Sequence, residues 1–333
     1  MKTKAAILET LGKPLVIDEL EILPLGVGQV LVEVHRSSIC GRQLAEISGA
    51  KGPDKYLPHL MGHEGGGIVI DIGSGVTHVK PGNHVSMHWR KGAGIEARPP
   101  KYGRGAGFVG AGQIATFTEL AVVSENRLTP ISDDFDFEIA AMMGCAVTTG
   151  LGLINNEAKL KIGQSIAVIG CGGVGLNVIQ GAAMVSAYPI IAVDKILEKL
   201  NMAMDYGATR SLNNIPNENF DVIVECTGIP SMIEMAYRLT APGGKCIMVG
   251  QPHYMDALGL PFMSQHFTGK TLMDSQGGLT NPTVDIPRYL ELYRQGKLKL
   301  DSQITHAFPL DDINKAIEVA KSGDCGKVML ELR

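Results

Sequence analysis

The hydrophobic positions of the chain follow two different patterns. Over about the first 140 residues, short apolar runs alternate with turns rich in glycine and proline, as in "QVLVEVHRSSI", "GGIVIDIG" and "TFTELAVVSENRLTPI". Runs of β-branched residues bounded by such turns are typical of strands. This pattern predicts a β-rich first part of the chain.

The middle of the chain has a different character. "QSIAVIG", "PIIAVD", "FDVIVECTG" and "GKCIMVG" are short apolar runs of the kind found in strands buried on both faces. Helical stretches lie between them: Val174, Val178 and Ala182 recur at helix spacing, and "KILEKLNMAMDYGA" and "SMIEMAYRLTAPGG" follow the next two runs. Because strand and helix alternate from about Gln164 to Gly250, we predict a parallel sheet flanked by helices.

The pattern changes again after about Gly278. Two amphipathic stretches, "DIPRYLELYRQG" and "DDINKAIEVAKSG", predict helices, and "KVMLEL" predicts a closing strand. Periodicity alone does not say which part of the fold this tail joins.

Composition narrows the class of protein. A chain of 333 residues with 45% hydrophobic and 19% charged residues can bury a large core, and its length predicts two domains. The net charge of −4 gives no electrostatic reason to expect binding to nucleic acid or to an anionic membrane. We see no signal peptide, no run of about 18 apolar residues and no close pair among the six cysteines, so we expect a cytoplasmic protein without a disulfide framework.

The sharpest local motif is "VIGCGGVG", which follows a predicted strand and opens a predicted helix. Its G-x-G-x-x-G pattern is formed by Gly170, Gly172 and Gly175, which suit a tight turn, close approach of a pyrophosphate, and close helix–strand packing. Asp194 ends the next strand about 20 residues later, where a carboxylate accepts from both ribose hydroxyls and repels a 2′-phosphate. We therefore predict that the chain binds NAD. The candidate cofactor residues of this region are Gly170, Gly172, Gly173, Val174, Gly175, Asp194 and Lys199.

Three other features carry chemistry only if they converge. They are Cys40, the "GHEGGG" turn with His63 and Glu64, and Cys145 in "GCAVTTG". Catalytic zinc commonly takes three S and N ligands and keeps a fourth position open. However, a lone cysteine is most often a small buried hydrophobic residue, and the separations between these residues match no local zinc signature.

The ordered motifs supply that convergence by resemblance. The succession "ICG", "GHEGGGIVIDIGSGVTHVKPGNHV", "GCAVTTGLG", "VIGCGGVG" and "AVD", continued by "FDVIVECTG", "APGGKCIMVG" and "SGDCGKVMLEL", resembles the zinc-dependent medium-chain alcohol dehydrogenase family over nearly the whole chain. The resemblance implies an α/β protein with a β-rich, GroES-like catalytic domain (1–147 and 277–333) and an inserted Rossmann domain with a doubly wound parallel sheet (148–276). It also implies a homodimer or homotetramer.

Site residues follow from the same resemblance. It implies that Cys40, His63 and Cys145 bind a catalytic zinc, with Glu64 as a second-sphere or exchanging ligand. Thr149, Thr227 and Val249 are expected near the nicotinamide nucleotide, and Lys327 near its pyrophosphate. Such enzymes transfer a hydride between NAD(H) and an alcohol or carbonyl substrate whose oxygen the zinc polarises.

The sequence departs from the family in ways that affect function. The segment after Val85 usually holds four cysteines for a structural zinc but here reads "SMHWRKGAGIEARPPKYGRGAGF", so we predict one zinc per chain. Arg42 stands where a Ser or Thr usually begins a proton relay, and Gln43 where Asp is frequent. Since arginine stays charged near neutral pH, the proton is left to water, Glu64 or His88.

The segment from Arg90 to Arg104 is also unusually basic. It contains five Lys or Arg residues and only one acid, Glu96, although the whole chain is acidic. Because arginine forks bind carboxylates and phosphates, we hypothesise a small anionic substrate: a phosphorylated, carboxylated or nucleotide-linked polyol, sugar or other alcohol. The candidate substrate residues are Arg42, His88, Trp89 and Arg90. The alternative is a solvated loop and an Arg42 that pairs with a nearby acid.

Two other functional classes stay open at this point. A zinc-free quinone or enoyl reductase of the same superfamily is disfavoured by Cys40, His63, Cys145 and Asp194. A non-catalytic nucleotide-binding sensor is kept open by the missing proton relay.

Overall fold

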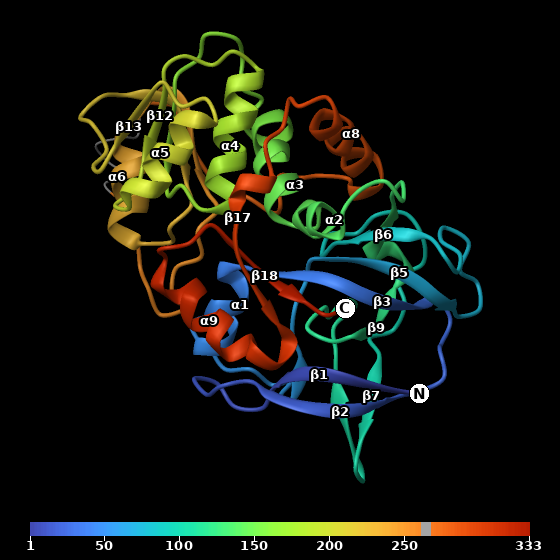
Figure 1. The fold of residues 1–333 in the computed structure, drawn as a ribbon. Helices are drawn as coiled ribbons and strands as arrows, with labels where there is room; N and C mark the ends of the chain where they lie inside the picture. The colour runs from blue at the N-terminus through green and yellow to red at the C-terminus, as the bar shows by residue number, and fades with distance from the viewer. Residues whose placement is uncertain (261–267) are drawn as a thin grey trace. The chain divides into compact units, whose positions relative to one another are not determined.

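The computed structural model describes residues 1–260 and 268–333, which form two compact units (Figure 1). The first unit comprises Met1–Cys145 and Asn281–Arg333, and the second comprises Ala146–Thr280. Each unit has its own sheet structure and its own hydrophobic core.

The first unit contains a closed barrel and a second, larger sheet. The barrel has the order β1 (Lys2–Leu8), β2 (Val16–Ile22), β7 (Lys101–Arg104), β8 (Gly107–Gly110) and β4 (His59–Leu60). The larger sheet has the order β10 (Leu128–Pro130), β6 (His84–Met87), β5 (Gly65–Ile72), β3 (Gln29–Ile39), β18 (Lys327–Glu331) and β17 (Ile304–Pro309), and β9 (Leu120–Ser124) also pairs with β3. Its helices are α1 (Gly41–Ser48), α2 (Phe137–Met143), α8 (Pro282–Arg294) and α9 (Ile313–Ser322), with short 3₁₀ turns η1 (Glu125–Arg127), η3 (Asp301–Gln303) and η4 (Leu310–Asp312).

Strand β3 shows how the period-two pattern builds this unit. Val30, Val32 and Val34 point into one cluster of buried residues, and Leu31 points into the other. Alternate side chains of a strand face opposite sides of the sheet, so a strand with apolar residues in both registers lies between two cores. The prediction that "QVLVEVHRSSI" forms a strand is confirmed.

The C-terminal tail belongs to the first unit. Strand β18 runs antiparallel beside β3, with Val328 opposite Ile39 and Glu331 opposite Arg36. In Figure 1 these red and blue strands lie side by side, and helix α9 lies beside α1. The tail thus adds a strand beside β3, the strand that directly precedes Cys40. Periodicity alone had not shown which part of the fold the tail joins.

The second unit is the predicted parallel sheet flanked by helices. Its strands have the order β13 (Arg210–Leu212), β12 (Ile190–Val193), β11 (Ile166–Ile169), β14 (Phe220–Glu225), β15 (Thr240–Met248) and β16 (Thr271–Asp274), all parallel. Alternating residues of β11 enter two cores. One is shared with the π-helical η2 (Leu153–Ala158), α4 (Gly173–Met184) and α5 (Leu197–Asp205), and the other with α6 (Pro230–Leu239). Helix α3 (Ala146–Gly152) precedes η2 and packs against α4. Helices therefore cover both faces of the sheet, as in a doubly wound fold.

Two local predictions need correction. The helical stretch predicted to run to Gly244 ends at Leu239, and strand β15 begins at Thr240. Pro242 lacks a backbone N–H, and Gly243 has a φ of +73°, so neither suits a continuing helix. Helix α1 was not predicted, because eight residues are too few for a clear period.

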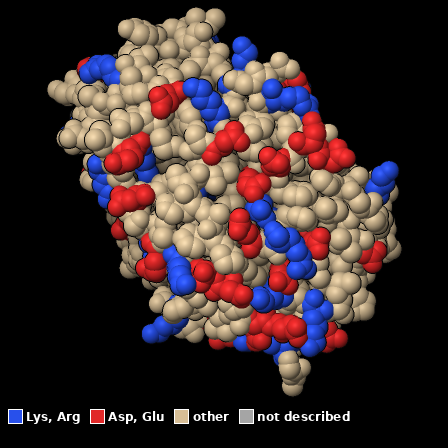
Figure 2. All heavy atoms as spheres, viewed as in Figure 1, with Lys and Arg blue, Asp and Glu red and all other residues tan. Residues whose placement is uncertain are grey.

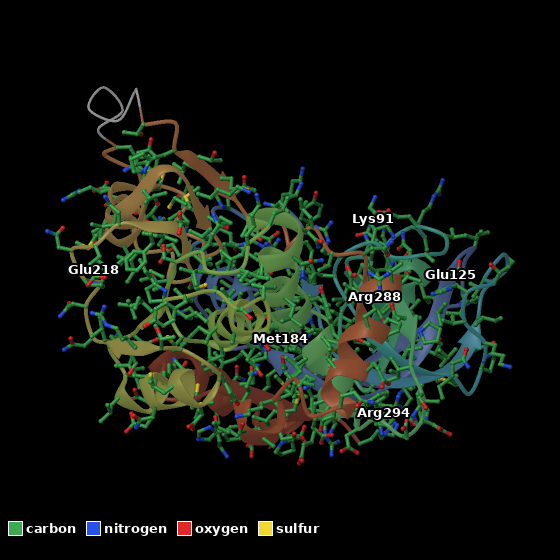
Figure 3. All side chains as sticks on the ribbon, turned by 90° about the horizontal axis from the view of Figure 1, so that it is seen from above. Lys91, Glu125, Met184, Glu218, Arg288 and Arg294 are labelled. Atoms are coloured by element: carbon green, nitrogen blue, oxygen red, sulfur yellow. The ribbon has the colours of Figure 1, made fainter. Side chains whose placement is uncertain are left out.

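A buried carboxylate organises the loop that lacks the structural-zinc cysteines. Glu125, which Figure 3 labels, is fully buried, and its two oxygens accept backbone N–H bonds from Thr77 (2.7 Å), His78 (2.6 Å) and Ile95 (2.7 Å). Burial acts to raise the pKa of Glu125, but the three N–H donors and His78 outweigh it and lower that pKa. One carboxylate thus joins two loop segments that are distant in sequence.

Acidic and basic side chains are interspersed on the face shown in Figure 2, which agrees with the small net charge of the chain. Among residues 1–260 and 268–333, no single helix has the length and apolar composition to cross a membrane; only the bent pair Phe137–Met143 and Ala146–Ala158 passes that test together.

The first prediction concerns Glu125. We expect Glu125→Gln to lower the free energy of unfolding of the first unit by about 1–3 kcal/mol, because an amide oxygen replaces only one of two acceptors. Denaturant unfolding followed by Trp89, the one tryptophan of the chain, measures this. Because the pKa of Glu125 is lowered in the fold, the difference is fully present above the ordinary value of 4.5 and is lost as the pH falls through the folded value. The exposed Glu21→Gln is the control, and an equal effect of both variants would contradict the assignment.

Candidate metal and dinucleotide sites

Cys40, His63 and Cys145 converge within the first unit. One ligand atom from each lies within 4.8 Å of the other two. Cys40 follows β3 as the residue before α1, His63 lies just before β5, and Cys145 follows α2. Adjacent strands β3 and β5, which pair Ser37 with Gly65, bring the first two together.

A glycine allows the third ligand to approach. A Cβ atom added at Gly144 would lie 2.2 Å from the carbonyl oxygen of Met87 and 2.8 Å from the Cβ of Glu64. Any side chain here would therefore push the end of α2 away from β6 and from Glu64. Gly144 is thus the position that places Cys145 against the strands carrying the other ligands.

Only one of the two neighbouring thiols, that of Cys40, loses its proton easily. The neighbouring Cys145 thiol is the main cause that lowers the pKa of Cys40 well below its ordinary value, and His63 adds to this effect. The Cys40 thiolate and burial together raise the pKa of Cys145 well above its ordinary value. Cys40 is therefore the first of the pair to become a thiolate, which is the form that binds metals.

Behind the ligands lies a buried ion pair. Glu64 is fully buried, and its Oε1 accepts hydrogen bonds from Lys327 Nζ (2.6 Å) and Ser38 Oγ (2.5 Å). Burial acts to lower the pKa of Lys327, but the charges of Glu64, Cys40 and Cys145 outweigh it and raise that pKa. Strand β18 places Lys327 beside β3, where its partner in the structure is Glu64; its predicted place near a pyrophosphate stays a prediction.

Sequence reasoning missed the side chain that contacts His63. Gln43 is buried with Ile47 on one face of α1, and its Oε1 accepts a hydrogen bond from the Cys40 backbone N–H at 3.0 Å. Its Nε2 lies against His63 Nδ1. One sequence signal could have predicted this contact. Gln43 stands three residues after Cys40, which is the spacing of a helix capping box with Cys in place of the usual Ser or Thr.

The donor set fits a zinc ion. His63 Nε2 and Glu64 Oε2 are buried and have no hydrogen-bond partner among the described residues. Buried polar atoms of this kind ordinarily have partners, so their absence points to a bound group. Two sulfurs and one imidazole nitrogen are a common catalytic zinc set, and the carboxylate behind them fits a second-sphere or exchanging role.

A second group of possible ligands is already satisfied. Glu46, Asp54 and His59 also offer atoms within 4.8 Å of one another. However, His59 Nε2 lies 2.8 Å from Asp54, its Nδ1 lies 2.9 Å from the carbonyl oxygen of Leu60, and Lys51 pairs with Glu46 at 3.4 Å. These contacts explain why the three side chains lie together, and no metal ion is needed for that.

The glycine motif forms the turn between β11 and α4 in the second unit. Gly170 has a φ of +95°, and Gly172 precedes α4 with open space where a Cβ would lie. A Cβ at Gly175 would lie 1.9 Å from the carbonyl oxygen of Gly170, so only glycine allows α4 to pack so closely. The helix N-terminus, which includes Gly173 and Val174, is therefore accessible to a phosphate.

Asp194 is tied to this turn. Its Oδ2 accepts from Cys171 N–H (2.8 Å), and its Oδ1 accepts from Ile196 N–H (3.0 Å). Each carboxylate oxygen retains a lone pair for a ribose hydroxyl. The remaining predicted cofactor residues also lie in this unit: Thr149 is buried in α3, Lys199 is half-buried in α5, Thr227 is exposed after β14, and Val249 is half-buried after β15.

His88 does not have the free nitrogen that a substrate or proton-relay role requires. The side chain is buried, its Nδ1 donates to the carbonyl oxygen of Arg90 (2.8 Å), and its Nε2 accepts from Thr129 Oγ1 (2.9 Å). Burial is the main cause that lowers its pKa to about 4, so the ring is neutral near pH 7. These contacts argue against the predicted substrate or relay role of His88 and indicate that the residue supports the loop.

The predicted anion clamp in the basic loop is also largely occupied by the protein's own groups. Lys91 pairs with Glu96, Lys101 lies over the ring of Phe108, and Arg104 pairs with Glu9 and Asp18. The guanidinium of Arg90 lies 5.8 Å from the centre of the half-buried Trp89 ring. Arg42, in contrast, is exposed at the start of α1, with no hydrogen bond or ion pair in the described part of the chain.

Comparisons with known proteins agree with this architecture. The family model for the alcohol dehydrogenase GroES-like domain matches residues 26–133, and that for zinc-binding dehydrogenase matches residues 173–294. The chain is 32% identical to S-(hydroxymethyl)glutathione dehydrogenase from Paracoccus denitrificans, over 97% of this chain and 98% of that protein, and 31% identical to alcohol dehydrogenase class-3 from Cereibacter sphaeroides, with the same coverage. The structure superposes on benzyl alcohol dehydrogenase from Acinetobacter calcoaceticus with a TM-score of 0.89, 25% identity and full coverage of both chains.

The two folds and the cluster of two cysteines and one histidine are those of a zinc-binding dehydrogenase. With the matches above, they show that the chain belongs to the zinc-dependent medium-chain alcohol dehydrogenase family. It is an oxidoreductase of the alcohol dehydrogenase type, and the family implies zinc and NAD.

The second prediction concerns the metal content. We expect the purified protein to bind one zinc per chain, and Cys145→Ser to lose most of it, because one of three ligands is removed. Elemental analysis after dialysis against a weak chelator measures this. Cys325→Ser, a cysteine outside the cluster in the same unit, serves as the control and should keep its zinc. Two tightly held zinc ions per wild-type chain would refute the prediction.

Proposed function

We propose that the protein is a zinc- and NAD(H)-dependent dehydrogenase that interconverts an alcohol and its carbonyl compound. The observation that carries this proposal is the convergence of Cys40, His63 and Cys145 from three separate segments of one unit. The glycine turn with Asp194 in the other unit supports the nucleotide part of the proposal.

In this proposal, each residue of the metal site has a definite task. Cys40, His63 and Cys145 hold the ion, which when bound supplies Lewis acidity toward a substrate oxygen. Glu64 adds a buried negative charge behind the ligands, and Lys327 compensates that charge at 2.6 Å. The pair engages only Oε1 of Glu64, and Oε2 has no hydrogen-bond partner among the described residues.

The nucleotide preference is proposed from Asp194. The glycine turn offers backbone N–H groups to a pyrophosphate, and the free lone pairs of Asp194 accept from the adenosine ribose. NAD, when bound, supplies the hydride acceptor. A 2′-phosphate would meet the negative charge of Asp194, so we propose NAD rather than NADP.

Among the basic residues considered, Arg42 supports the proposal of an anionic substrate. The basic loop no longer supports it, because Lys91 and Arg104 are paired with carboxylates. Arg42 is the second residue of α1, two positions after Cys40, where a Ser or Thr relay residue is usual. Its guanidinium group is exposed. The relatives named S-(hydroxymethyl)glutathione dehydrogenase have a substrate name that describes a carboxylated alcohol. We therefore propose a small, carboxylated or phosphorylated alcohol.

Assembly and location are proposed from the resemblance and the sequence. We propose a homodimer or homotetramer in the cytoplasm that binds small molecules.

The third prediction tests the activity. We expect NADH formation when the zinc-loaded protein meets NAD and a panel of neutral, carboxylated and phosphorylated alcohols, and we expect Cys145→Ser to lose at least about a hundredfold in kcat/KM, about 2.7 kcal/mol of transition-state stabilisation. Cys325→Ser is the matched control. Binding of zinc and NAD without turnover on any panel member would contradict the proposal and favour the sensor alternative.

The fourth prediction tests the substrate class. We expect Arg42→Ala to lower kcat/KM about tenfold, or about 1.4 kcal/mol, on S-(hydroxymethyl)glutathione and less than about threefold on benzyl alcohol. The reason is that the guanidinium contributes only where the substrate carries an anion. Arg98→Ala, another exposed arginine of the same unit, is the control. Equal losses on both alcohols would contradict a role of Arg42 in anion recognition.

A further inference from the structure

Gln43 occupies a position where its amide must serve two neighbours. It is 1% exposed and lies in the first turn of α1, between the Cys40 backbone and the His63 ring. Both neighbours belong to residues of the metal cluster. The orientation of this amide therefore affects how His63 faces the ion.

Chemistry fixes that orientation in the metal-free site. The backbone N–H of Cys40 can only donate, so the Gln43 group that faces it at 3.0 Å must be the carbonyl oxygen. The amide nitrogen then faces His63 Nδ1 and donates to it. In this arrangement both hydrogen bonds are satisfied, since Nδ1 acts as an acceptor.

This bond sets the tautomer of His63. A neutral imidazole whose Nδ1 accepts a hydrogen bond carries its proton on Nε2. His63 Nε2 is the buried nitrogen without a hydrogen-bond partner, and it is the nitrogen left for the metal cluster. Without zinc, Gln43 therefore places a proton on the atom that has to bind the ion.

Zinc binding reverses the requirement on Gln43. When Nε2 is a ligand, the proton of the neutral ring lies on Nδ1, which becomes a donor. Two donors, Cys40 N–H and His63 Nδ1–H, then face one amide that has a single acceptor oxygen. Whichever way the amide turns, one buried N–H group has no acceptor. A carboxylate at this position would accept from both.

We propose that Gln43 is a positioning residue that couples zinc loading to a tautomer change of His63 and an amide rotation, and that it weakens zinc binding compared with a carboxylate in its place. The inference rests on the proposed zinc site. It predicts a site that releases and exchanges its zinc more readily than the same three ligands would with a carboxylate at position 43.

The fifth prediction follows directly. We expect Gln43→Glu, which has the same shape, to bind zinc about tenfold more tightly, a gain of about 1.4 kcal/mol. Competition of the full-length protein with a chromogenic chelator, at a pH of about 8 where histidine is neutral, measures this affinity. Ser48→Glu adds a charge to an exposed position of the same helix and should leave the zinc affinity within about twofold.

A spectroscopic measurement separates positioning from simple stabilisation. In ¹⁵N-labelled, metal-free protein, long-range ¹H–¹⁵N spectra should show His63 as the Nε2–H tautomer in the wild type and as the Nδ1–H tautomer in Gln43→Glu. Gln43→Met keeps the volume and removes both polar groups, so it should populate both tautomers. These spectra also decide the question if Gln43→Glu folds poorly.

The outcomes distinguish the inference from the proposed function. If the wild type binds no zinc at Cys40, His63 and Cys145, the zinc site itself is refuted. If the wild type binds zinc there but Gln43→Glu binds it no more tightly, or the His63 tautomer is the same in all variants, the role of Gln43 is refuted and the zinc site is not.

Discussion

The first unit depends on the buried ion pair between Glu64 and Lys327. An unpaired buried charge costs several kcal/mol, so Glu64 requires a cation and further donors inside the protein. Ser38 on β3 and Lys327 on β18 supply them. Strand β18 thus contributes both to the sheet and to this ion pair, and removal of either partner would leave the other as an unpaired buried charge.

The same pair connects packing to electrostatics at the metal cluster. Lys327 lies close enough to Cys40 and Cys145 that its charge favours thiolates, while Glu64 and the mutual repulsion of the sulfurs oppose a second thiolate. A divalent cation resolves that conflict, because it binds both sulfurs and compensates the excess negative charge. Besides the loop that lacks the structural-zinc cysteines, the chain departs from the family pattern on α1, where Arg42 is exposed and Gln43 is buried. Helix α1 thus carries one departure that faces solvent, Arg42, and one that contacts a candidate ligand, Gln43.

The sequence alone predicted those parts of the fold that depend on local patterns of residues. Strands such as β11 and β14 are apolar on both faces, and the glycine turn has a fixed spacing, so the parallel sheet and its turn were predictable. The convergence of the three candidate ligands came from the order of family motifs, since their separations carry no signal. Contacts between distant segments were not predictable: Lys327 meets Glu64 across 263 positions, and Arg104 is paired with Glu9 and Asp18 rather than exposed. The contact of Gln43 with His63 was not predicted, because α1 is too short for its periodicity to show which side chains it buries.

The position of Lys327 has a consequence for biosynthesis. Cys40, His63, Glu64 and Cys145 are all made well before β18, and protein chains fold from the N-terminus as they emerge. Glu64 therefore has no Lys327 partner until β18 is made, and β3 lacks its β18 neighbour from Arg36 to Ile39 until then. The ion pair behind the candidate ligands can therefore form only after the intervening second unit has been synthesised.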